Sequence, residues 1–447
     1  MRNIIFPKNL YSDIRIENRF ITLISLKNGK PSQCKEVEAE KAFLRVFDGK
    51  TWYYCSTTSV DEIQKELDNL AKFATENPRI YDHPIVKAYE VNKEKVFQFE
   101  NRSVRKVSID DKSEFLSKLN EKINSKFITL KNAFYIDRNS RYEFYSSKGA
   151  KIEYDFQKAG FSVSVAFTSG KKSFNAPYSY SGISFEELSL DENKINDFIK
   201  ECENFLLNAK PLEKAGNYPV ILSPLATGIF AHESFGHKSE ADFMLGDETM
   251  AKEWALGKKV GSELLSIVDS GIDLGSGYVP FDDEGTKATK TYLIKNGVLS
   301  GRLHSLATAE ALGEKPTGNA RAISCEFEPI VRMTNTFIEG GESSFEDLVK
   351  GISHGYFIKT VNHGSGMSTF TLAPNICYEI KDGKIGDPVK IAVITGNVFK
   401  TLSLIDGVSK EVELLSFITG GCGKMEQSDL SVGFGGPYVR ISKMGVQ

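Results

Sequence analysis

Residues 223–237 read SPLATGIFAHESFGH and follow an apolar, strand-like segment at 218–222. Ser223 is a favoured residue for capping a helix N-terminus, and Pro224 suits the first helical position. The pattern therefore predicts a strand that leads into a helix. His232, Glu233 and His237 then fall in the third and fourth turns of that helix.

The two histidines are five residues apart, one more than in the HExxH pattern of many zinc enzymes. At about 100° per residue, positions five apart on an α-helix point about 140° apart, so their side chains could not share a metal ion. A one-residue π-bulge, or a helix that loosens at Gly236, would return His237 to the side of His232. We therefore expect a local departure from α-helical geometry, and a regular α-helix through His237 would count against a shared metal.

Imidazole, carboxylate and thiol groups are all available for a metal site. Neutral imidazoles are good ligands for Zn²⁺, and an adjacent glutamate can take a proton from water that the metal activates. Near the C-terminus, Cys422 stands in the glycine-rich sequence GGCGK at 420–424, where the backbone can wrap closely and Lys424 would favour a thiolate. Glu240 is a competing third ligand, or a partner that accepts a hydrogen bond from a histidine ring.

The rest of the sequence predicts an α+β protein in two halves. In the first half, β-rich flanks around Asp48-Gly49 predict a hairpin, alternation at 127–168 predicts antiparallel strands, and apolar spacing at 195–209 predicts a helix. We expect an N-terminal α/β half with an antiparallel sheet at 1–216, available for substrate binding and dimer contacts. We expect the C-terminal half at 217–447 to be mostly antiparallel and barrel-like, and to carry the metal-site helix.

Composition narrows the class of protein. The chain has 56 basic and 59 acidic residues and a net charge of -3. It therefore lacks the excess of basic residues that would predict a nucleic-acid partner. The longest apolar stretch, 220–231, is shorter than the roughly 20 residues that cross a bilayer. The first residues, MRNIIFP, lack the apolar run of a signal peptide, and the six cysteines form no CxxC pair. These features predict a cytoplasmic protein with reduced thiols and no membrane partner.

Several ordered motifs resemble the TldD/PmbA metalloprotease family. They are HESFGH at 232–237, EADF at 240–243, DDEGT at 282–286, PTGN at 316–319, RMTNT at 332–336 and GGCGK at 420–424. The resemblance is to the TldD-like members that keep an HExxxH motif and a C-terminal cysteine. It implies a peptidase whose metal is held by His232, His237 and Cys422, with Glu233 as general base.

The resemblance also implies a dimer, either with a second copy or with a motif-poor paralogue. We expect one divalent transition metal per chain, and the ligand set of two histidines and one cysteine favours zinc. Unfolded or extended peptides are the expected substrates, because a sheet edge can bind them through main-chain hydrogen bonds. The alternative is a non-catalytic regulatory or scaffold subunit of a peptidase complex, although three ligands with one open position favour catalysis.

Three further segments have less specific interpretations. The acidic residues at 282–284 most simply form a solvated turn or helix cap, and otherwise a site for a hard cation. Arg332 and Asn335 are expected to organise strand ends near the site. His363, in a Gly- and Ser-rich stretch, could line the cleft.

Overall fold

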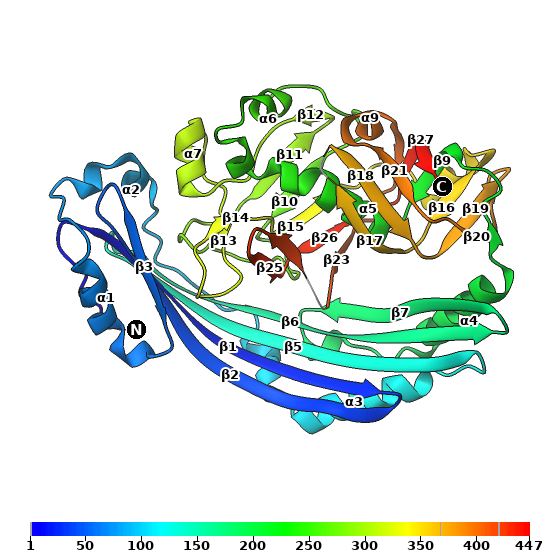
Figure 1. The fold of residues 1–447 in the computed structure, drawn as a ribbon, viewed down its shortest axis with the longest axis horizontal. Helices are drawn as coiled ribbons and strands as arrows, with labels where there is room; N and C mark the ends of the chain where they lie inside the picture. Colours follow the sequence, from blue (N-terminus) through cyan, green and yellow to red (C-terminus); the bar gives the residue numbers. More distant parts are fainter. Residues whose placement is uncertain (1, 367, 419–420) are drawn as a thin grey trace.

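A long curved sheet and a second, C-terminal unit make up the fold in Figure 1, a computed structural model that describes residues 2–366, 368–418 and 421–447. The curved sheet comes from the N-terminal half of the chain, and the C-terminal unit holds two further large sheets. The predicted α+β class is confirmed.

The N-terminal sheet has seven strands in the order β3-β2-β1-β5-β6-β4, with β7 paired to β6. All its pairs are antiparallel except β4 with β6. The strands are β1 (Tyr11–Lys27), β2 (Lys30–Phe47), β3 (Trp52–Thr57), β4 (Lys95–Val96), β5 (Ile128–Ser146), β6 (Lys151–Ser169) and β7 (Lys172–Gly182). The predicted hairpin joins β2 to β3, and Gly49 in its turn has φ +99°, a conformation that favours glycine.

Most helices of this half cover one face of this sheet, and the other face turns toward the C-terminal unit (Figure 1). The short helix at 84–88 packs on that second face, against Tyr11 and Phe47. The helices of this half are α1 (Ile63–Ala71), α2 (Pro84–Ala88), α3 (Ile109–Lys122) and α4 (Glu192–Asn208), with short 3₁₀ turns η1 (Val60–Glu62), η2 (Ile80–Asp82), η3 (Glu100–Arg102), η4 (Val104–Lys106) and η5 (Phe185–Glu187). The apolar stripes of α3 and α4, including Leu116, Leu119 and Ile199, are buried against the sheet. The helix predicted at 195–209 is therefore confirmed as α4.

The C-terminal unit contains a six-stranded sheet, β12-β11-β10-β15-β26-β23, and a ten-stranded sheet, β17-β18-β21-β27-β9-β16-β19-β20-β8, in which β22 also pairs with β27. Two small hairpins, β13-β14 and β24-β25, complete it. The strands are β8 (Lys210–Pro211), β9 (Gly216–Leu222), β10 (Ile267–Ser270), β11 (Lys290–Lys295), β12 (Val298–Leu299), β13 (Ala320–Arg321), β14 (Ile330–Val331), β15 (Asn335–Ile338), β16 (His354–Ile358), β17 (Val361–Gly366), β18 (Thr369–Pro374), β19 (Cys377–Lys381), β20 (Lys384–Lys390), β21 (Ile394–Asn397), β22 (Ile405–Val408), β23 (Glu413–Ser416), β24 (Cys422–Lys424), β25 (Gln427–Leu430), β26 (Gly433–Gly436) and β27 (Val439–Val446).

The helix predicted after Ser223 lies between the two C-terminal sheets. It is α5 (Pro224–Ala231), which contacts β15, β23 and β26 of one sheet and β9 and β17 of the other. The remaining helical segments of this half are η6 (His232–Gly236), η7 (His237–Ser239), η8 (Ala241–Met244), α6 (Glu248–Glu253), α7 (Leu306–Leu312), α8 (Phe345–Lys350) and α9 (Val398–Ser403).

The two large C-terminal sheets are mostly antiparallel, as predicted, but both are open. Neither sheet closes on itself within the described residues, so the barrel-like closure expected from the sequence is corrected. The physical reason lies in α5, whose residues are buried almost all round. A helix that is apolar on every side needs cover on every side, and here a separate sheet supplies each side.

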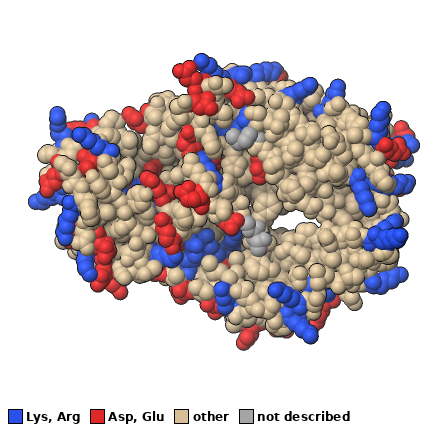
Figure 2. All heavy atoms as spheres, in the orientation of Figure 1, with Lys and Arg blue, Asp and Glu red and all other residues tan. Residues whose placement is uncertain are grey.

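The two units are in contact on either side of an opening, and on one side the contact extends to Ile418, which packs beside Gly160 of the curved sheet. At one end Arg15 pairs with Asp283, and at the other Tyr378 donates a hydrogen bond to Glu201. Figure 2 shows an opening between the two units, with basic and acidic side chains mixed over this face. No helix in the described part of the chain is long and apolar enough to cross a membrane.

Candidate metal centre

The segment that carries the two histidines leaves α-helical geometry where the sequence predicted it would. Ser223 caps α5 by accepting a hydrogen bond from the Ala226 N–H at 3.2 Å. After Ala231 the chain forms one turn of π-helix, His232–Gly236, in which the His237 N–H donates to the His232 carbonyl. The extra residue in this turn brings both imidazoles to one side of the helix. The predicted π-bulge is confirmed.

Gly236 is needed in this turn because the side chain of Met333 occupies the space beside it. A Cβ atom at position 236 would lie 2.0 Å from Met333 Sδ, far inside van der Waals contact. The φ of Gly236 is -56°, which is ordinary for a helix, so the backbone conformation does not require glycine here. The close packing of Met333 does.

His232, His237 and Cys422 form one cluster in the structure. Their donor atoms all lie within 4.8 Å of one another, and Cys422 Sγ is 3.5 Å from His237 Nε2. His232 and Cys422 are buried, and His237 is half-buried. The hairpin β24-β25 thus brings a cysteine to two histidines that precede it by almost half the chain.

The electrostatics of the cluster favour a thiolate. Burial alone would raise the pKa of Cys422, but hydrogen bonds from His232 and His237 lower it to about 5. Burial would lower the pKa of His237, but its hydrogen bonds to Cys422 and Glu240 raise it to about 10. These values describe a Cys422 thiolate beside a protonated His237. Metal binding would release the His237 proton and leave one thiolate and two imidazole nitrogens, a ligand set that suits Zn²⁺.

One unpaired atom also fits a metal site. The buried Nδ1 atom of His232 has no hydrogen-bond partner among the described residues. A buried polar atom without a partner costs free energy, so its presence in a cluster of potential ligands calls for an explanation. A metal ion held by these side chains would supply one.

Glu240 lies beside His237 rather than within the cluster of donor atoms. Its Oε2 atom is 3.4 Å from His237 Nδ1, while Nε2 on the same ring is the atom nearest Cys422. This is the arrangement in which a carboxylate fixes the orientation of a ligating imidazole. Of the two roles considered from the sequence, the geometry favours the hydrogen-bonding partner.

Sequence reasoning missed the roles of Lys424 and Asp242. Lys424 Nζ is 3.0 Å from Glu240 Oε2 and 2.7 Å from each carboxylate oxygen of Asp242. Part of the role of Lys424 could have been found from strand periodicity. Residues two apart on a strand point to the same face, which places Cys422 and Lys424 on one face of β24. Lys424 therefore links the strand that carries the cysteine to the turn that follows the histidines.

Arg332 also holds the strand that carries Cys422. Its guanidinium is fully buried and donates to the carbonyl oxygens of Cys422 and Gln427. Asn335 donates to the carbonyls of Ser270 and Asp273. The expectation that Arg332 and Asn335 organise backbone near the site is confirmed.

A cavity of about 150 Å³ opens beside the cluster. It is lined by Ile229, His232, Glu233, His237, Phe417, Gly421, Cys422, Gly423, Val432 and Phe434. Glu233 is half-buried, and strand β17 passes directly beside it, because a Cβ atom on Gly364 would lie 3.3 Å from Glu233 Cγ. His363 is exposed on β17 and is not part of this lining. Gly420 of the predicted glycine-rich turn lies outside the described residues.

The acidic segment 282–284 differs in the structure from the solvated turn that its composition predicted. Asp282 and Glu284 are 3% and 7% exposed, so the expected solvated turn is wrong. The helix cap expected as its alternative is confirmed, because the Glu284 carboxylate accepts a hydrogen bond from the N–H of Leu306, the first residue of α7. The Asp282 carboxylate accepts hydrogen bonds from the backbone N–H groups of Glu284, Thr286 and Ala320. Burial, and then the nearby Glu284 carboxylate, raise the pKa of Asp282. The segment therefore orders loops at the junction of the two units.

Comparison with known proteins assigns the chain to a family of metallopeptidases. Family models described as PmbA/TldA metallopeptidase domain 1, central domain and C-terminal domain match residues 12–77, 102–210 and 215–447. All three descriptions are of metallopeptidase domains, and the C-terminal model alone covers more than half of the chain. The chain belongs to the PmbA/TldD metallopeptidase family.

Individual relatives agree with this assignment. Metalloprotease slr0863 of Synechocystis is 43% identical over 235 residues, a match that spans 52% of this chain and 50% of that protein. The zinc metalloprotease TldD homolog of Saccharolobus solfataricus is 29% identical over 98% of this chain and 96% of its own. The crystal structure of TldE from Thermococcus kodakarensis has a TM-score of 0.76 at 16% identity and covers 98% of this chain and 96% of that chain, which shows a shared fold.

Proposed function

We propose that this chain is a metal-dependent peptidase whose single divalent metal ion, zinc, is held by His232, His237 and Cys422. The observation that carries the proposal is the meeting of these three donor groups within 4.8 Å beside a cavity. The unpaired His232 Nδ1 and the word zinc in the name of the Saccharolobus relative also support it. Bound there, zinc would act as a Lewis acid that polarises a peptide carbonyl and lowers the pKa of water toward neutrality.

We assign Glu233 the role of general base. It follows His232 directly on the π-helical turn and lines the same cavity as the three proposed ligands. Its carboxylate is outside the cluster of donor atoms, so it is available to accept a proton from water that attacks the substrate. The same carboxylate can then return that proton to the leaving amine.

We propose extended, unfolded peptides as the substrates. The cavity lies between two strands that end their sheets: β17 passes beside Glu233, and β23 leads into Phe417, which lines the cavity. In the described residues β17 pairs with β18 alone, so one of its edges has free backbone groups. An extended peptide can add to such an edge through main-chain hydrogen bonds, with little dependence on its sequence.

We further propose a cytoplasmic dimer, formed with a second copy or with a motif-poor paralogue. All six cysteines are free thiols in this structure, in keeping with a reducing compartment. Within the chain we keep the division near Gly216 as a proposal: residues 1–216 would contribute to substrate binding and dimer contacts, and residues 217–447 would carry the peptidase site.

The test is the variant Glu233→Gln, which keeps the size of the side chain but cannot take a proton. We expect it to bind metal as the wild type does and to cleave an unstructured peptide at least about a hundredfold more slowly. Glu248→Gln is the matched control, because Glu248 is an exposed residue of α6 whose side chain is 89% exposed. Cleavage at the wild-type rate would refute the mechanism. A wild-type protein that binds metal but cuts no peptide would favour the scaffold-subunit alternative.

A further inference from the structure

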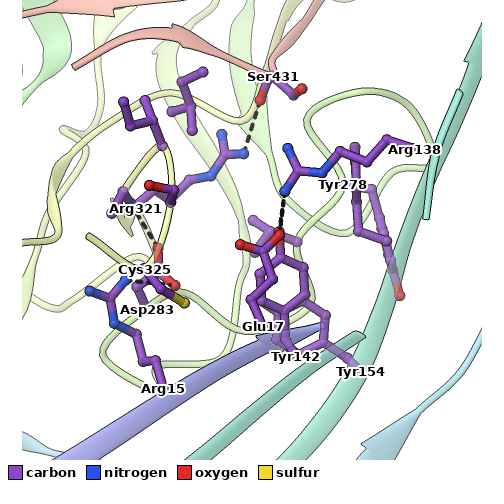
Figure 3. A pocket seen from close by; sticks show the side chains of 16 residues that line it. Arg15, Glu17, Arg138, Tyr142, Tyr154, Tyr278, Asp283, Arg321, Cys325 and Ser431 are labelled. Atoms are coloured by element: carbon purple, nitrogen blue, oxygen red, sulfur yellow. Dashed lines mark hydrogen bonds and ion pairs between the residues drawn. The ribbon is translucent and has the colours of Figure 1, made fainter. Parts of the chain in front are cut away.

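A second cavity lies between the curved sheet and the C-terminal unit, separate from the metal centre (Figure 3). Its interior volume is about 50 Å³. The segment 430–432 separates the two cavities, because Leu430 and Ser431 line this one and Val432 lines the other. Nothing in the proposed peptidase mechanism uses this second cavity.

Three guanidinium groups line the cavity, and two of them have acidic partners. From the sheet, Arg15 pairs with Asp283 at 3.1 Å. Arg138, also from the sheet, pairs with Glu17 at 2.7 Å (Figure 3). These contacts join β1 and β5 to each other and to the loop at 283.

The Glu17 carboxylate is shared between two arginines. Arg19 also binds it, at 2.7 Å, so one negative charge faces two positive charges. Burial would raise the pKa of Glu17, but Arg138 and Arg19 lower it to about 2, so the carboxylate stays ionised. The local balance is therefore positive even after this acid is counted.

Arg321 is the third guanidinium, and it has no acidic partner. It is 7% exposed and donates to the carbonyl oxygen of Met333 and to that of Ser431, the second of which Figure 3 shows. No carboxylate of the described residues lies within 4.0 Å of it. These two carbonyl oxygens accept from only two of its five N–H groups and do not neutralise its charge. Burial, and then the nearby Arg332, lower the pKa of Arg321, which reflects the cost of this charge.

Lys158 adds a further cation on the same face of the sheet. It lies directly opposite Arg138 on the neighbouring strand, and directly opposite residues share a face. Lys158 is 8% exposed and has no ion-pair partner within 4.0 Å in the described part of the chain. Burial and Arg138 lower the pKa of Lys158 to about 8, and Asp429 acts against this from a greater distance.

The charges around the cavity therefore do not balance. Four arginines, at positions 15, 19, 138 and 321, face the two carboxylates of Glu17 and Asp283. Close to Arg321, the charges of Arg332 and Asp269 offset each other, and Asp429 offsets Lys158, so two positive charges remain. Buried charge without a counter-ion is costly, and a bound anion would offset that cost. The volume also suits one, because a single water needs only about 10–15 Å³ of such space.

We propose that this cavity binds a small oxyanion, a carboxylate or a phosphate, through the guanidinium groups of Arg321 and Arg138. Planar guanidinium groups match the paired oxygens of both anions. Tyr154 and Phe156 contribute aromatic walls that limit competition from water. Because Arg138 belongs to the sheet and Arg321 to the C-terminal unit, the anion would bridge the two halves of the chain.

The experiment is isothermal titration calorimetry of the full chain with inorganic phosphate and, in a separate arm, with acetate, at constant ionic strength. We expect saturable binding of at least one anion at one site per chain, together with a rise in the unfolding temperature. Arg321→Gln should weaken binding at least about tenfold. Arg141→Gln is the control, because Arg141 lies on β5, the strand of Arg138, and its side chain is 56% exposed.

The outcomes separate this proposal from the peptidase proposal. Glu233→Gln should bind the anion like the wild type, whatever its effect on peptide cleavage. If Arg321→Gln does not fold, Arg138→Gln decides, since it leaves the hydrogen bonds of Arg321 in place. Binding of neither anion by the wild type, or unchanged binding in Arg138→Gln and in any folded Arg321→Gln, would overturn the proposal.

Discussion

Replacing Lys424 by methionine removes the cation that joins the strand of Cys422 to the turn after the π-helix. The Lys424 side chain is 2% exposed and its Nζ atom contacts Glu240 at 3.0 Å and Asp242 at 2.7 Å. Methionine has a similar length and no charge, so it keeps most of the packing. The variant therefore leaves two carboxylates close together without their shared cation.

The structure sets the expected size of the effect. Glu240 is fully buried, and removing one partner of a buried ion pair costs up to about 3–5 kcal/mol, because the remaining charge keeps little compensation, here only His237 at 3.4 Å. We expect the free energy of unfolding of Lys424→Met to fall by about this amount. Glu240 also fixes His237, and losing such a partner typically weakens metal binding by about 10- to 100-fold.

Two measurements check this prediction. Urea unfolding of metal-free protein gives the change in stability, and titration with Co²⁺, followed by its thiolate absorption band, gives the metal affinity. Lys424→Arg keeps the charge and should recover part of both. Lys259→Met is the matched control, because Lys259 pairs with Glu263 where both side chains are more than half exposed, and such pairs contribute at most about 1 kcal/mol.

A Lys424→Met variant that loses no more stability than Lys259→Met and binds Co²⁺ like the wild type would contradict both proposed roles of Lys424. A loss of stability with unchanged Co²⁺ affinity would separate the two roles. In that case Lys424 would hold the strand in place without orienting His237 through Glu240.

Three further predictions address the metal, the substrate and acid stability. His232→Ala and Cys422→Ala should each lower metal content, measured by mass spectrometry, from about one ion per chain; full metal and activity in Cys422→Ala would point to Glu240 as the ligand. The enzyme should cut a destabilised, unfolded variant of a domain and spare its stable parent, because a folded domain has few free backbone groups; equal cleavage rates would contradict the sheet-edge model. The folded-state pKa of Glu17 is about 2, below its ordinary 4.5, so its contribution to stability is present above pH 4.5 and is lost as the pH falls toward 2. The stability difference between wild type and Glu17→Gln should therefore shrink across that range in urea unfolding, and a constant difference would argue against the ion pairs.

Local features of the site could be predicted from the sequence. Ser223 and Pro224 determine where α5 begins, because capping depends only on neighbouring residues. The five-residue spacing of His232 and His237 predicts the π-helical turn, because the angle per residue is fixed by backbone geometry. The grouping of Cys422 with the two histidines as metal ligands was inferred from the resemblance to a family. No rule of local structure connects residues so far apart in the sequence.

The sequence could not predict how distant segments share buried space. The acidic residues at 282–284 have the composition of a solvated turn, and only their place between the two units makes Asp282 and Glu284 buried. The open C-terminal sheets likewise follow from α5 lying between them, which no strand pattern encodes.

Local conformations follow from neighbouring residues: the cap at Ser223, the turn at Asp48-Gly49 and the extra residue between the two histidines. The meeting of distant groups, such as Lys424 with Asp242 and Arg321 with the curved sheet, depends on the packing of the whole chain. The physical reason is the range of the interactions. Backbone geometry and capping act over a few residues, whereas contacts between distant segments exist only once the whole chain has packed.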